Sequence, residues 1–324
     1  MIVIFSNSLD VTADYVSSRL EQNQLQYIRL NTDQLAEKAE LLYKCNVFSL
    51  FVDHQILELD NVASVWYRRP QSLKPRHDLP FMEGEQAHTV SEWNAAIEGF
   101  LAHIPTDLWI NHPANNASAL SKLEQLSRAN NIGLASPDTL VTQSFEEIMQ
   151  FWKECKGDLI VKPISHGYIE RSDPKEDTLI FTNQVSLEQL NNNQELISLC
   201  PTLFQRKVEK IFDVRINIVD EEVIAVAIYA SKQNKLQAVD IRRDNMKKVR
   251  YELIDLPLSL KSKVLELCRS YNLRFAAVDM AFTKEFDWVF FEINPNGQWA
   301  WLDLEGVTDI ASSLIKSMQF KLHG

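Results

Sequence analysis

The chain has 324 residues, of which 45% are apolar and 24% are charged, and its formal net charge at pH 7 is −11. This length exceeds that of one typical core, so two or three packed units are expected, and the balanced composition argues against long disordered regions. The acidic balance excludes nonspecific binding to nucleic acid or to anionic membranes as an expected function, because no surplus of basic side chains is present to displace phosphate counterions.

The sequence predicts a protein of the cytoplasm. Its longest apolar runs, such as residues 223–230, are far shorter than the roughly 18 residues that cross a bilayer. The apolar start, residues 1–5, lacks the basic flank and the cleavage site of a signal peptide and is expected to form a strand. The four cysteines and seven histidines show no spacing typical of a zinc site or a disulfide framework, which indicates a reducing compartment.

The first third of the chain has the pattern of an α/β unit. Strands are expected at residues 2–6, 26–30 and 62–68, and helices at residues 11–22 and about 85–103. The polar turn formers of residues 111–116 then interrupt the pattern. The amino-terminal domain is therefore expected to cover residues 1–115.

Residues 116–200 are expected to form a central unit. Asn116 or Ser118 would cap a helix that runs to residue 131, and a capping box at Ser144 would begin a second helix. The expected strands of this unit lie at residues 159–162 and 178–182, and a short helix begins at residue 186.

Residues 201–324 are rich in strands and form the expected third unit. Period-two alternation and β-branched residues distinguish these strands from the two helices that would cover them. The strands are expected at residues 214–219, 223–230, 237–242, 275–283 and 288–294, and the helices near residues 259–271 and 307–319. The chain is therefore predicted to have an α/β (α+β) fold of three units.

The hairpin near the carboxyl end contains two acidic residues in apolar strands. If residues 284–287 form the connecting loop, Thr283 would oppose Trp288, and Asp279 would lie directly across from Glu292, with the two β-carbons ~5 Å apart. Two opposed carboxylates repel each other and resist burial unless a cation neutralises them. The alternative is a hydrogen-bonded hairpin end with one carboxylate exposed.

Asn294 lies on the same strand face as Glu292, because residues two apart in a strand point the same way. Its amide adds a neutral oxygen to the two carboxylates. A ligand set made only of oxygen, with room for water and phosphate, favours Mg²⁺ over zinc.

A nucleotide bound there would need cations for its phosphates, because the glycine-rich phosphate loops of other nucleotide-binding proteins are absent from the sequence. Lys162 ends an apolar run, where a buried ammonium requires an anionic partner; alternatively, its side chain extends to solvent. Lys122 lies in a predicted helix, and taken alone it has the pattern of a solvated lysine.

Two further strands pair an acidic residue with an arginine on one face. Alternation places Asp213 and Arg215 together, and Asp240 and Arg242 repeat the arrangement. Surface ion pairs across strands would explain the pattern. The alternative is a pair of guanidinium groups that stabilise negative charge on a transferring phosphoryl group.

Together these residues resemble the ATP-grasp superfamily and, within it, the microviridin-type peptide ligases that make graspetides. The resemblance covers nearly the whole chain. Its most specific motif is Glu-Ile-Asn-Pro-Asn-Gly-Gln-Trp at 292–299. Glu-x-Asn alone is shared by the whole superfamily, whereas the Asn-Gly-Gln-Trp extension narrows the resemblance to the peptide ligases. The other matching motifs are Val-Trp-Tyr-Arg-Arg-Pro at 65–70, Lys122, Val-Lys-Pro at 161–163, the adenine hinge at 201–208, Asp-Val-Arg at 213–215 and Asp-Ile-Arg at 240–242.

The resemblance implies a three-unit ATP-grasp fold with an α/β pre-ATP-grasp domain, and ATP and Mg²⁺ as cofactors. It implies that a carboxylate is activated as an acyl phosphate, without a covalent enzyme nucleophile. The implied metal ligands are Asp279, Glu292 and Asn294, and the implied catalytic residues are Arg215, Arg242 and Asp240. The implied ATP-binding residues are Lys122, Lys162, Gln205, Arg206, Lys207, Val208 and Asp213.

By the same resemblance, the substrate is a ribosomal precursor peptide whose Asp or Glu side chains are joined to Ser, Thr or Lys side chains. Its leader would dock near residues 186–193, and Arg68 and Arg69 would either serve the peptide or form a structural ion pair. The oligomeric state stays open, with a homodimer as one alternative.

Two alternative functions remain. A RimK-like ligase would add an amino acid to a protein or small molecule, and the Asn-Gly-Gln-Trp extension disfavours it. A catalytically silent nucleotide-binding module would have no need of a complete set of metal and phosphate residues.

Overall fold

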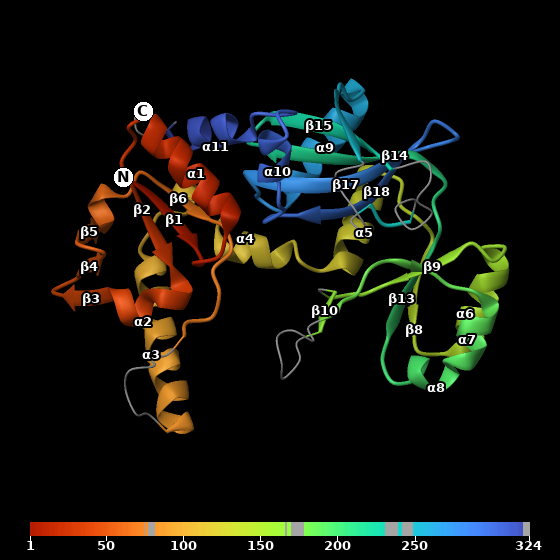
Figure 1. Cartoon of the computed structure of the whole chain (residues 1–324), viewed down its shortest axis with the longest axis horizontal. Helices are drawn as coiled ribbons and strands as arrows, with labels where there is room; N and C mark the ends of the chain where they lie inside the picture. The colour runs from red at the N-terminus through yellow and green to blue at the C-terminus, as the bar shows by residue number, and fades with distance from the viewer. Residues whose placement is uncertain are drawn as a thin grey trace.

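The computed structural model describes residues 1–74, 76, 82–165, 167–169, 178–230, 239–241 and 249–319. In this part of the chain, helices and strands are mixed in an α/β arrangement, as the sequence predicts. Figure 1 shows an amino-terminal part in red and orange, a central sheet in green, and a carboxy-terminal sheet in blue-green and blue.

The amino-terminal part is built on a parallel sheet with the strand order β2-β1-β6-β7. Every residue of β1 is buried, because this mainly apolar strand has neighbours on both sides. The helix that follows begins at Asp10, whose carboxylate accepts hydrogen bonds from the amides of Thr12 and Ala13. The elements are β1 (Ile2–Ser6), α1 (Val11–Gln22), β2 (Tyr27–Asn31), α2 (Leu35–Lys38), β6 (Ser64–Tyr67), α3 (Glu83–Ala102) and β7 (Trp109–Ile110).

An antiparallel meander, which the sequence analysis did not predict, packs against this sheet. In its middle strand Phe48, Leu50 and Val52 are buried in alternation, and they join the core formed with Val3 and Phe5. The meander consists of β3 (Ala39–Lys44), β4 (Val47–Val52) and β5 (Gln55–Glu58), and the one-turn helices of this part are η1 (Thr32–Gln34), η2 (Leu59–Asn61) and η3 (Thr106–Leu108).

The central sheet has the order β12-β9-β13-β8 and is covered by helices that bury Ile148, Phe151 and Leu190. The capping box predicted at Ser144 is half formed, since Ser144 accepts from the amide of Glu147 without a return bond from the Glu147 side chain to a described residue. Ser186 precedes α7 and forms a full box with Gln189. The elements are β8 (Thr139–Thr142), α6 (Phe145–Glu154), β9 (Leu159–Lys162), β10 (Tyr168–Ile169), β11 (Thr178–Leu179), β12 (Asn183–Gln184), α7 (Leu187–Asn192), α8 (Gln194–Ile197) and β13 (Thr202–Arg206).

The carboxy-terminal sheet is antiparallel, with the order β16-β15-β14-β17-β18. The strands predicted at residues 275–283 and 288–294 have the predicted bounds. Of the strand predicted at residues 237–242, only 239–241 are described, and they form no strand. The elements are β14 (Lys210–Val219), β15 (Glu222–Tyr229), β16 (Arg250–Ile254), α9 (Leu258–Ser270), β17 (Phe275–Thr283), β18 (Trp288–Asn294), α10 (Ala300–Leu304) and α11 (Ile310–Gln319).

The helix expected from residue 116 to 131 is instead two helices, α4 (Pro113–Ser118) and α5 (Lys122–Ile132). Proline is well suited to the first turn of α4, and Ser121, in place of Asn116 or Ser118, precedes α5. Gly133 ends α5 with a φ of +83°.

The sheets divide the chain differently from the expected boundaries. Ala119, Leu126 and Ala129, from the expected central unit, pack in the core of the carboxy-terminal sheet. Conversely, β13 pairs with β9 and β8 in the central sheet, although residues 201–206 were grouped with the third unit.

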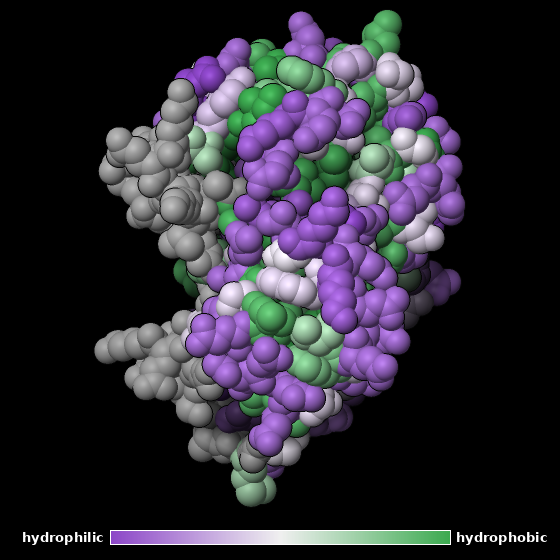
Figure 2. Space-filling view, turned by 90° about the vertical axis from the view of Figure 1, so that its right-hand side faces the viewer, coloured by the Kyte–Doolittle hydropathy of each residue, from purple (hydrophilic) through white to green (hydrophobic). Residues whose placement is uncertain are grey.

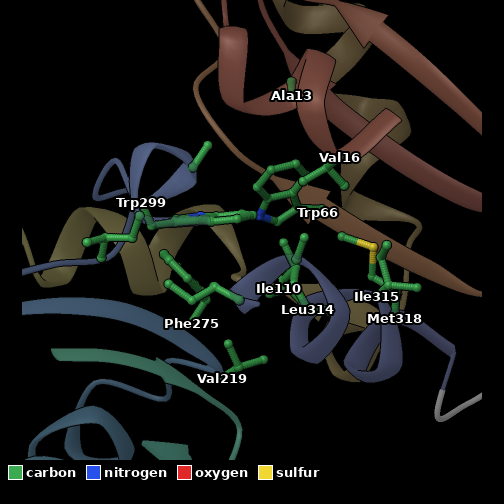
Figure 3. Close-up of a cluster of buried hydrophobic side chains, with 14 of the residues drawn as sticks. Ala13, Val16, Trp66, Ile110, Val219, Phe275, Trp299, Leu314, Ile315 and Met318 are labelled. Atoms are coloured by element: carbon green, nitrogen blue, oxygen red, sulfur yellow. The ribbon is translucent and has the colours of Figure 1, made fainter. Parts of the chain in front are cut away.

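A large apolar core joins the amino-terminal part to the carboxy-terminal sheet. Trp66 from β6 and Trp299, which precedes α10, are 1% and 0% exposed. Figure 3 shows that side chains of α1 and β6 meet those of α11 and of the sheet residues Val219 and Phe275 in this core. The two parts are therefore fixed against each other by a shared hydrophobic core.

The opposite end of the molecule has a different surface. The face that carries α6 and α7 exposes mainly hydrophilic residues, interrupted by small apolar patches (Figure 2). Among the helices that the structure describes, none is long and apolar enough to cross a bilayer.

Asn111 forms a second link between the two parts. It is 2% exposed, and its amide nitrogen donates to the carbonyls of Phe275 and Pro295 at 2.8 and 3.3 Å. Its amide oxygen accepts from the backbone amides of Arg274 and Phe275 at 2.8 and 2.9 Å. One side chain therefore satisfies backbone groups at the start of β17 and at the end of β18.

Asn111→Ala is expected to lower the free energy of unfolding by about 3 kcal/mol, because it leaves several buried backbone groups without partners. Chemical denaturation followed by circular dichroism measures this effect. Asn115→Ala is the matched control, since Asn115 makes a single exposed hydrogen bond to Asn272. Equal stability of the two variants would contradict the role of Asn111.

Candidate active site

The predicted carboxylate pair is present on the carboxy-terminal sheet. Asp279 on β17 lies directly across from Glu292 on β18, as the sequence predicts. The predicted pairing of Thr283 with Trp288 is wrong, since Phe282 opposes Trp288. A β-bulge with Phe291 as the extra residue shifts the register by one and restores the pairing at the acids.

Arg215 joins this pair from the neighbouring strand. β14 places it directly across from Asp279, and its Nε lies 3.1 Å from Oδ1 of that carboxylate. The Glu292 side chain makes no hydrogen bond or ion pair with any residue that the structure describes. Arg215 therefore pairs with Asp279 and leaves the Glu292 carboxylate beside it, and two neighbouring carboxylates favour a metal cation.

Asn294 follows on the same face, two residues from Glu292. Its side-chain oxygen accepts a hydrogen bond from the amide of Asn296 at 2.9 Å, and its carbonyl accepts from Gly297 at 3.2 Å. These bonds fold residues 294–297 into a tight turn that fixes the direction of the Asn294 amide.

Gly297 in this turn lies against β14 and β17. A Cβ on Gly297 would be 2.3 Å from the Cβ of Ala277 and 3.3 Å from Nη1 of Arg215. Only glycine allows this close approach. The sequence marked Gly297 as part of a motif but gave no reason for it.

The donor set fits Mg²⁺. In the described part of the chain no group of three or more His, Cys, Asp or Glu residues forms a metal site. Two carboxylates and one amide oxygen are hard ligands, and Mg²⁺ typically takes its remaining ligands from water and phosphate. Asp279, Glu292 and Asn294 therefore suit a magnesium ion that is shared with a nucleotide.

Asn217 is a buried polar residue that the sequence did not single out as part of a site. It lies two residues beyond Arg215 on the same face and is 0% exposed. Neither atom of its amide has a hydrogen-bond partner in the described ranges. Strand alternation was the only signal that could have identified it.

A second acidic cluster lies on the other side of Arg215. Asp213 accepts a hydrogen bond from Nζ of Lys210 at 2.7 Å, and its side chain is 14% exposed. Burial raises the pKa of Asp213, and the Lys210 ammonium opposes this shift. Asp240 lies close enough to raise the same pKa further, and it accepts from the amide of Thr182 at 3.1 Å.

Lys210 was missed by the sequence analysis. A β-bulge between Lys210 and Phe212 brings it beside Asp213, three residues away. Regular strand alternation would place these two side chains on opposite faces. The bulge left no signal in the sequence.

The two candidate phosphate lysines are brought to one loop. Lys162 ends β9, and Nζ of Lys122 donates to the carbonyls of Pro163 and Ser165 at 2.7 and 2.9 Å. Beside Lys122 opens a cavity of about 620 Å³. It is lined by Ala117, Leu120, Ser121, Lys122, Leu123, Ile164, Ser165, Cys200 and Pro201 and does not include the carboxylate pair.

The predicted hinge side chains are engaged within the protein. Gln205 is 1% exposed and donates to Thr139 at 2.8 Å, whereas its amide oxygen has no partner among the described residues. Arg206 pairs with Asp138 at 2.8 Å, and Lys207 pairs with Glu209 at 3.0 Å. The backbone amides of Arg206 and Lys207 also donate within the protein, to the carbonyls of Asp138 and Asp158.

Val208 is the last residue of the predicted hinge and lies after β13, between the central and carboxy-terminal sheets. Its backbone amide has no acceptor in the part of the chain that the structure describes. Arg242, predicted as a catalytic residue, lies outside the described residues.

Arg68 and Arg69 differ in their surroundings. Arg68 is 0% exposed and contacts Asp10 and the backbone of residues 296 and 297. Burial lowers the pKa of Arg68 to about 9, and the Asp10 carboxylate opposes the shift. The structure thus favours a structural role for Arg68. Arg69 is half-buried, and its pKa is lowered by burial and by the charge of Arg215 nearby.

Comparison with known proteins gives a consistent result. The model of the MvdD pre-ATP grasp domain matches residues 1–117. The macrocyclase MdnC from Microcystis aeruginosa MRC, solved with precursor peptide MdnA, is 26% identical over 100% of this chain and 99% of that chain, with a TM-score of 0.83. A RiPP-associated ATP-grasp ligase of Chryseobacterium gregarium, in complex with ADP and a leader and core peptide, is 27% identical over 99% and 96%, with a TM-score of 0.86.

More distant structures share the fold. The D-alanine–D-alanine ligase of Bacillus anthracis, complexed with ATP, is 14% identical over 99% of this chain and 96% of that chain, with a TM-score of 0.57. No protein of curated function matches the sequence.

The fold and the similarity to these ligases over the whole chain therefore identify an ATP-grasp ligase. Within this class, the similarity to microviridin-type macrocyclases and other RiPP ligases is confirmed along the whole chain.

Proposed function

We propose that this ligase activates Asp or Glu side chains of a ribosomal precursor peptide as acyl phosphates and closes ester or amide crosslinks with Ser, Thr or Lys side chains. The observation that supports this proposal best is the alignment of Arg215, Asp279 and Glu292 across three neighbouring strands. This arrangement would offer both a metal site and a permanent cation to one reacting phosphoryl group.

ATP would bind between the central and carboxy-terminal sheets. Lys122 and Lys162 lie at the same loop and supply positive charge for phosphates. The hinge at Arg206–Val208 would contact adenine through its backbone, for which the free amide of Val208 is suited. Mg²⁺ held by Asp279, Glu292 and Asn294 would neutralise phosphate charge during the transfer.

Arg215 would stabilise the negative charge that develops on the phosphoryl group, because its guanidinium is fixed beside the carboxylate pair. Arg69 would bind the acidic side chain of the peptide. An anion between Arg69 and Arg215 would offset both the burial and the repulsion from Arg215 that lower the pKa of Arg69. Asp240, which lies near Asp213, and Arg242 are further catalytic candidates.

We further propose that the leader docks near α7 and that the reaction takes place in the cytoplasm. All four cysteines are free, in keeping with a reducing compartment.

The test is incubation of the protein with ATP, Mg²⁺ and candidate precursor peptides rich in Thr, Ser, Asp and Glu, followed by mass spectrometry. A macrocyclase removes one water per crosslink and releases ADP. A gain in peptide mass would support a RimK-like ligase instead, and no change in any peptide with no ADP release would contradict the proposal.

Lys162→Ala is expected to weaken ATP binding by about 10- to 100-fold, because a charge-assisted hydrogen bond to phosphate contributes about 1.5–3 kcal/mol. Isothermal titration calorimetry with ATP and Mg²⁺ measures the change. Lys153→Ala on the exposed side of α6 is the control and should bind as the wild type does. Unchanged affinity of Lys162→Ala would remove this lysine from the site.

A further inference from the structure

We propose that Arg68 of the amino-terminal part is a positioning residue for the metal site, which acts through the turn at residues 296–298 on Asn294 and Arg215. The inference rests on the proposed function, because Asn294 is a candidate metal ligand.

Arg68 is held at both ends of its guanidinium. Its Nη1 donates to the carbonyls of Asn296 and Gly297, the latter at 3.1 Å, and its Nη2 donates to Oε1 of Gln298 at 2.6 Å. Its Nε lies 3.4 Å from Asp10, and both side chains are 1% exposed. A planar fork with fixed donors suits this arrangement, whereas a single ammonium cannot reproduce it.

Other contacts fix the partners of Arg68. Asp10 is the N-cap of α1 and also accepts from Ser6 at 3.0 Å. Thr12, in the first turn of α1, donates to Oε1 of Gln298 at 2.5 Å. The beginning of α1 and the end of β6 therefore hold the turn from the amino-terminal side.

On its other side the same turn contacts the candidate metal site. The amide of Asn296 holds the side-chain oxygen of Asn294, and Gly297 packs against Ala277 and the guanidinium of Arg215. Movement of the carbonyls of Asn296 and Gly297 would thus turn the Asn294 oxygen away from the carboxylates. Substitution of residues that hold metal ligands in this way typically lowers metal affinity or activity by about 10- to 100-fold.

The role also explains why a cation lies buried at this position. Burying Arg68 and Asp10 is costly, and a buried pair of this kind gives little net stability. The pair instead fixes the orientation of three acceptors, the carbonyls of Asn296 and Gly297 and the side chain of Gln298, in a turn of the carboxy-terminal part. The expected function of the amino-terminal part therefore includes assembly of the metal site.

The test compares Arg68→Lys with Arg19→Lys. Arg19 also links the two parts, through Asp309 at 2.9 Å and Ser312 at 2.7 Å, but it does not contact the turn. Binding of Mn²⁺ in the presence of ADP is measured by electron paramagnetic resonance, and amide exchange of residues 294–298 is measured in protein without ligand. Both measurements use peptide-free protein, so they do not depend on which carboxylate is the substrate.

Arg68→Lys is expected to weaken Mn²⁺ binding by about 10-fold and to speed amide exchange at residues 294–298, while Arg19→Lys changes neither. In the full reaction kcat should fall by about 10-fold, with the KM for peptide unchanged. Gln298→Ala, which removes one acceptor and leaves the Arg68–Asp10 pair intact, should change the same quantities less, and it serves as the test if Arg68→Lys does not fold.

Wild-type Mn²⁺ affinity and exchange in a folded Arg68→Lys protein would overturn the inference. Equal losses in Arg19→Lys would also overturn it, since the effect would then be a general loosening of the two parts. A different result would contradict the proposed function: the wild-type protein would bind Mn²⁺ normally but would crosslink no peptide.

Discussion

Glu292→Gln is expected to lower the rate of ATP-dependent crosslinking by at least about 100-fold while the protein stays folded. The substitution keeps the shape of the side chain but removes one of the two charges that attract the metal. Because Asp279 is already paired with Arg215, Glu292 is the carboxylate without a cationic partner among the described residues. Its charge should therefore contribute most to metal binding.

The measurement is the initial rate of water loss from the peptide, with a thermal melt to confirm the fold. Glu285→Gln is the matched control, because Glu285 is an exposed residue in the turn of the same hairpin. Glu292→Gln should also be slightly more stable in the absence of metal, since it relieves repulsion from Asp279. Normal turnover in this variant would remove Glu292 from the metal site.

Gly297→Ala is expected to lower the turnover rate by about 100-fold and the free energy of unfolding by about 2–3 kcal/mol. The added methyl group would lie 2.3 Å from the Cβ of Ala277, a distance at which one strand or the turn must move. Either movement displaces Arg215 or Asn294, which are both in contact with the turn. Steady-state kinetics and chemical denaturation report the two effects.

A second substitution tests the cause directly. Ala277→Gly removes the opposing methyl group, so the double variant should recover part of both the stability and the rate. Gly84→Ala is the control, since a Cβ on Gly84 would have no atom within 4 Å. A Gly297→Ala protein with full activity would show that the turn tolerates displacement. This result would also argue against the proposed positioning role of Arg68.

The hairpin of β17 and β18 shows how far sequence reasoning reached. Alternation gave the bounds of both strands and the common face of Glu292 and Asn294, because the direction of a strand side chain depends only on its neighbours in sequence. The pairing of Asp279 with Glu292 came from the assumed loop at residues 284–287. The register at the turn was one residue off. The bulge at Phe291 compensated for this error, and no local pattern marked the bulge.

Arg68 and Arg69 show what the sequence could not predict. The sequence left Arg68 and Arg69 with the same two alternatives, since adjacent residues of one type have the same local pattern. In the folded chain both side chains donate to the carbonyl of Asn296, but Arg68 is fully buried against Asp10, whereas Arg69 is half-buried near Arg215. Which of them meets solvent is decided by how the amino-terminal part packs on the carboxy-terminal sheet.

The sequence by itself determined the strands and helices with strong periodicity, the opposed acids and the class of ligase, because these follow from local spacing and from one specific motif. Only the tertiary structure decided that β13 joins the central sheet, that α5 packs on the carboxy-terminal sheet, and that Lys210 meets Asp213. The physical reason is that burial and hydrogen-bond partners depend on contacts between segments far apart in the chain, and such contacts leave no periodic signal in either segment.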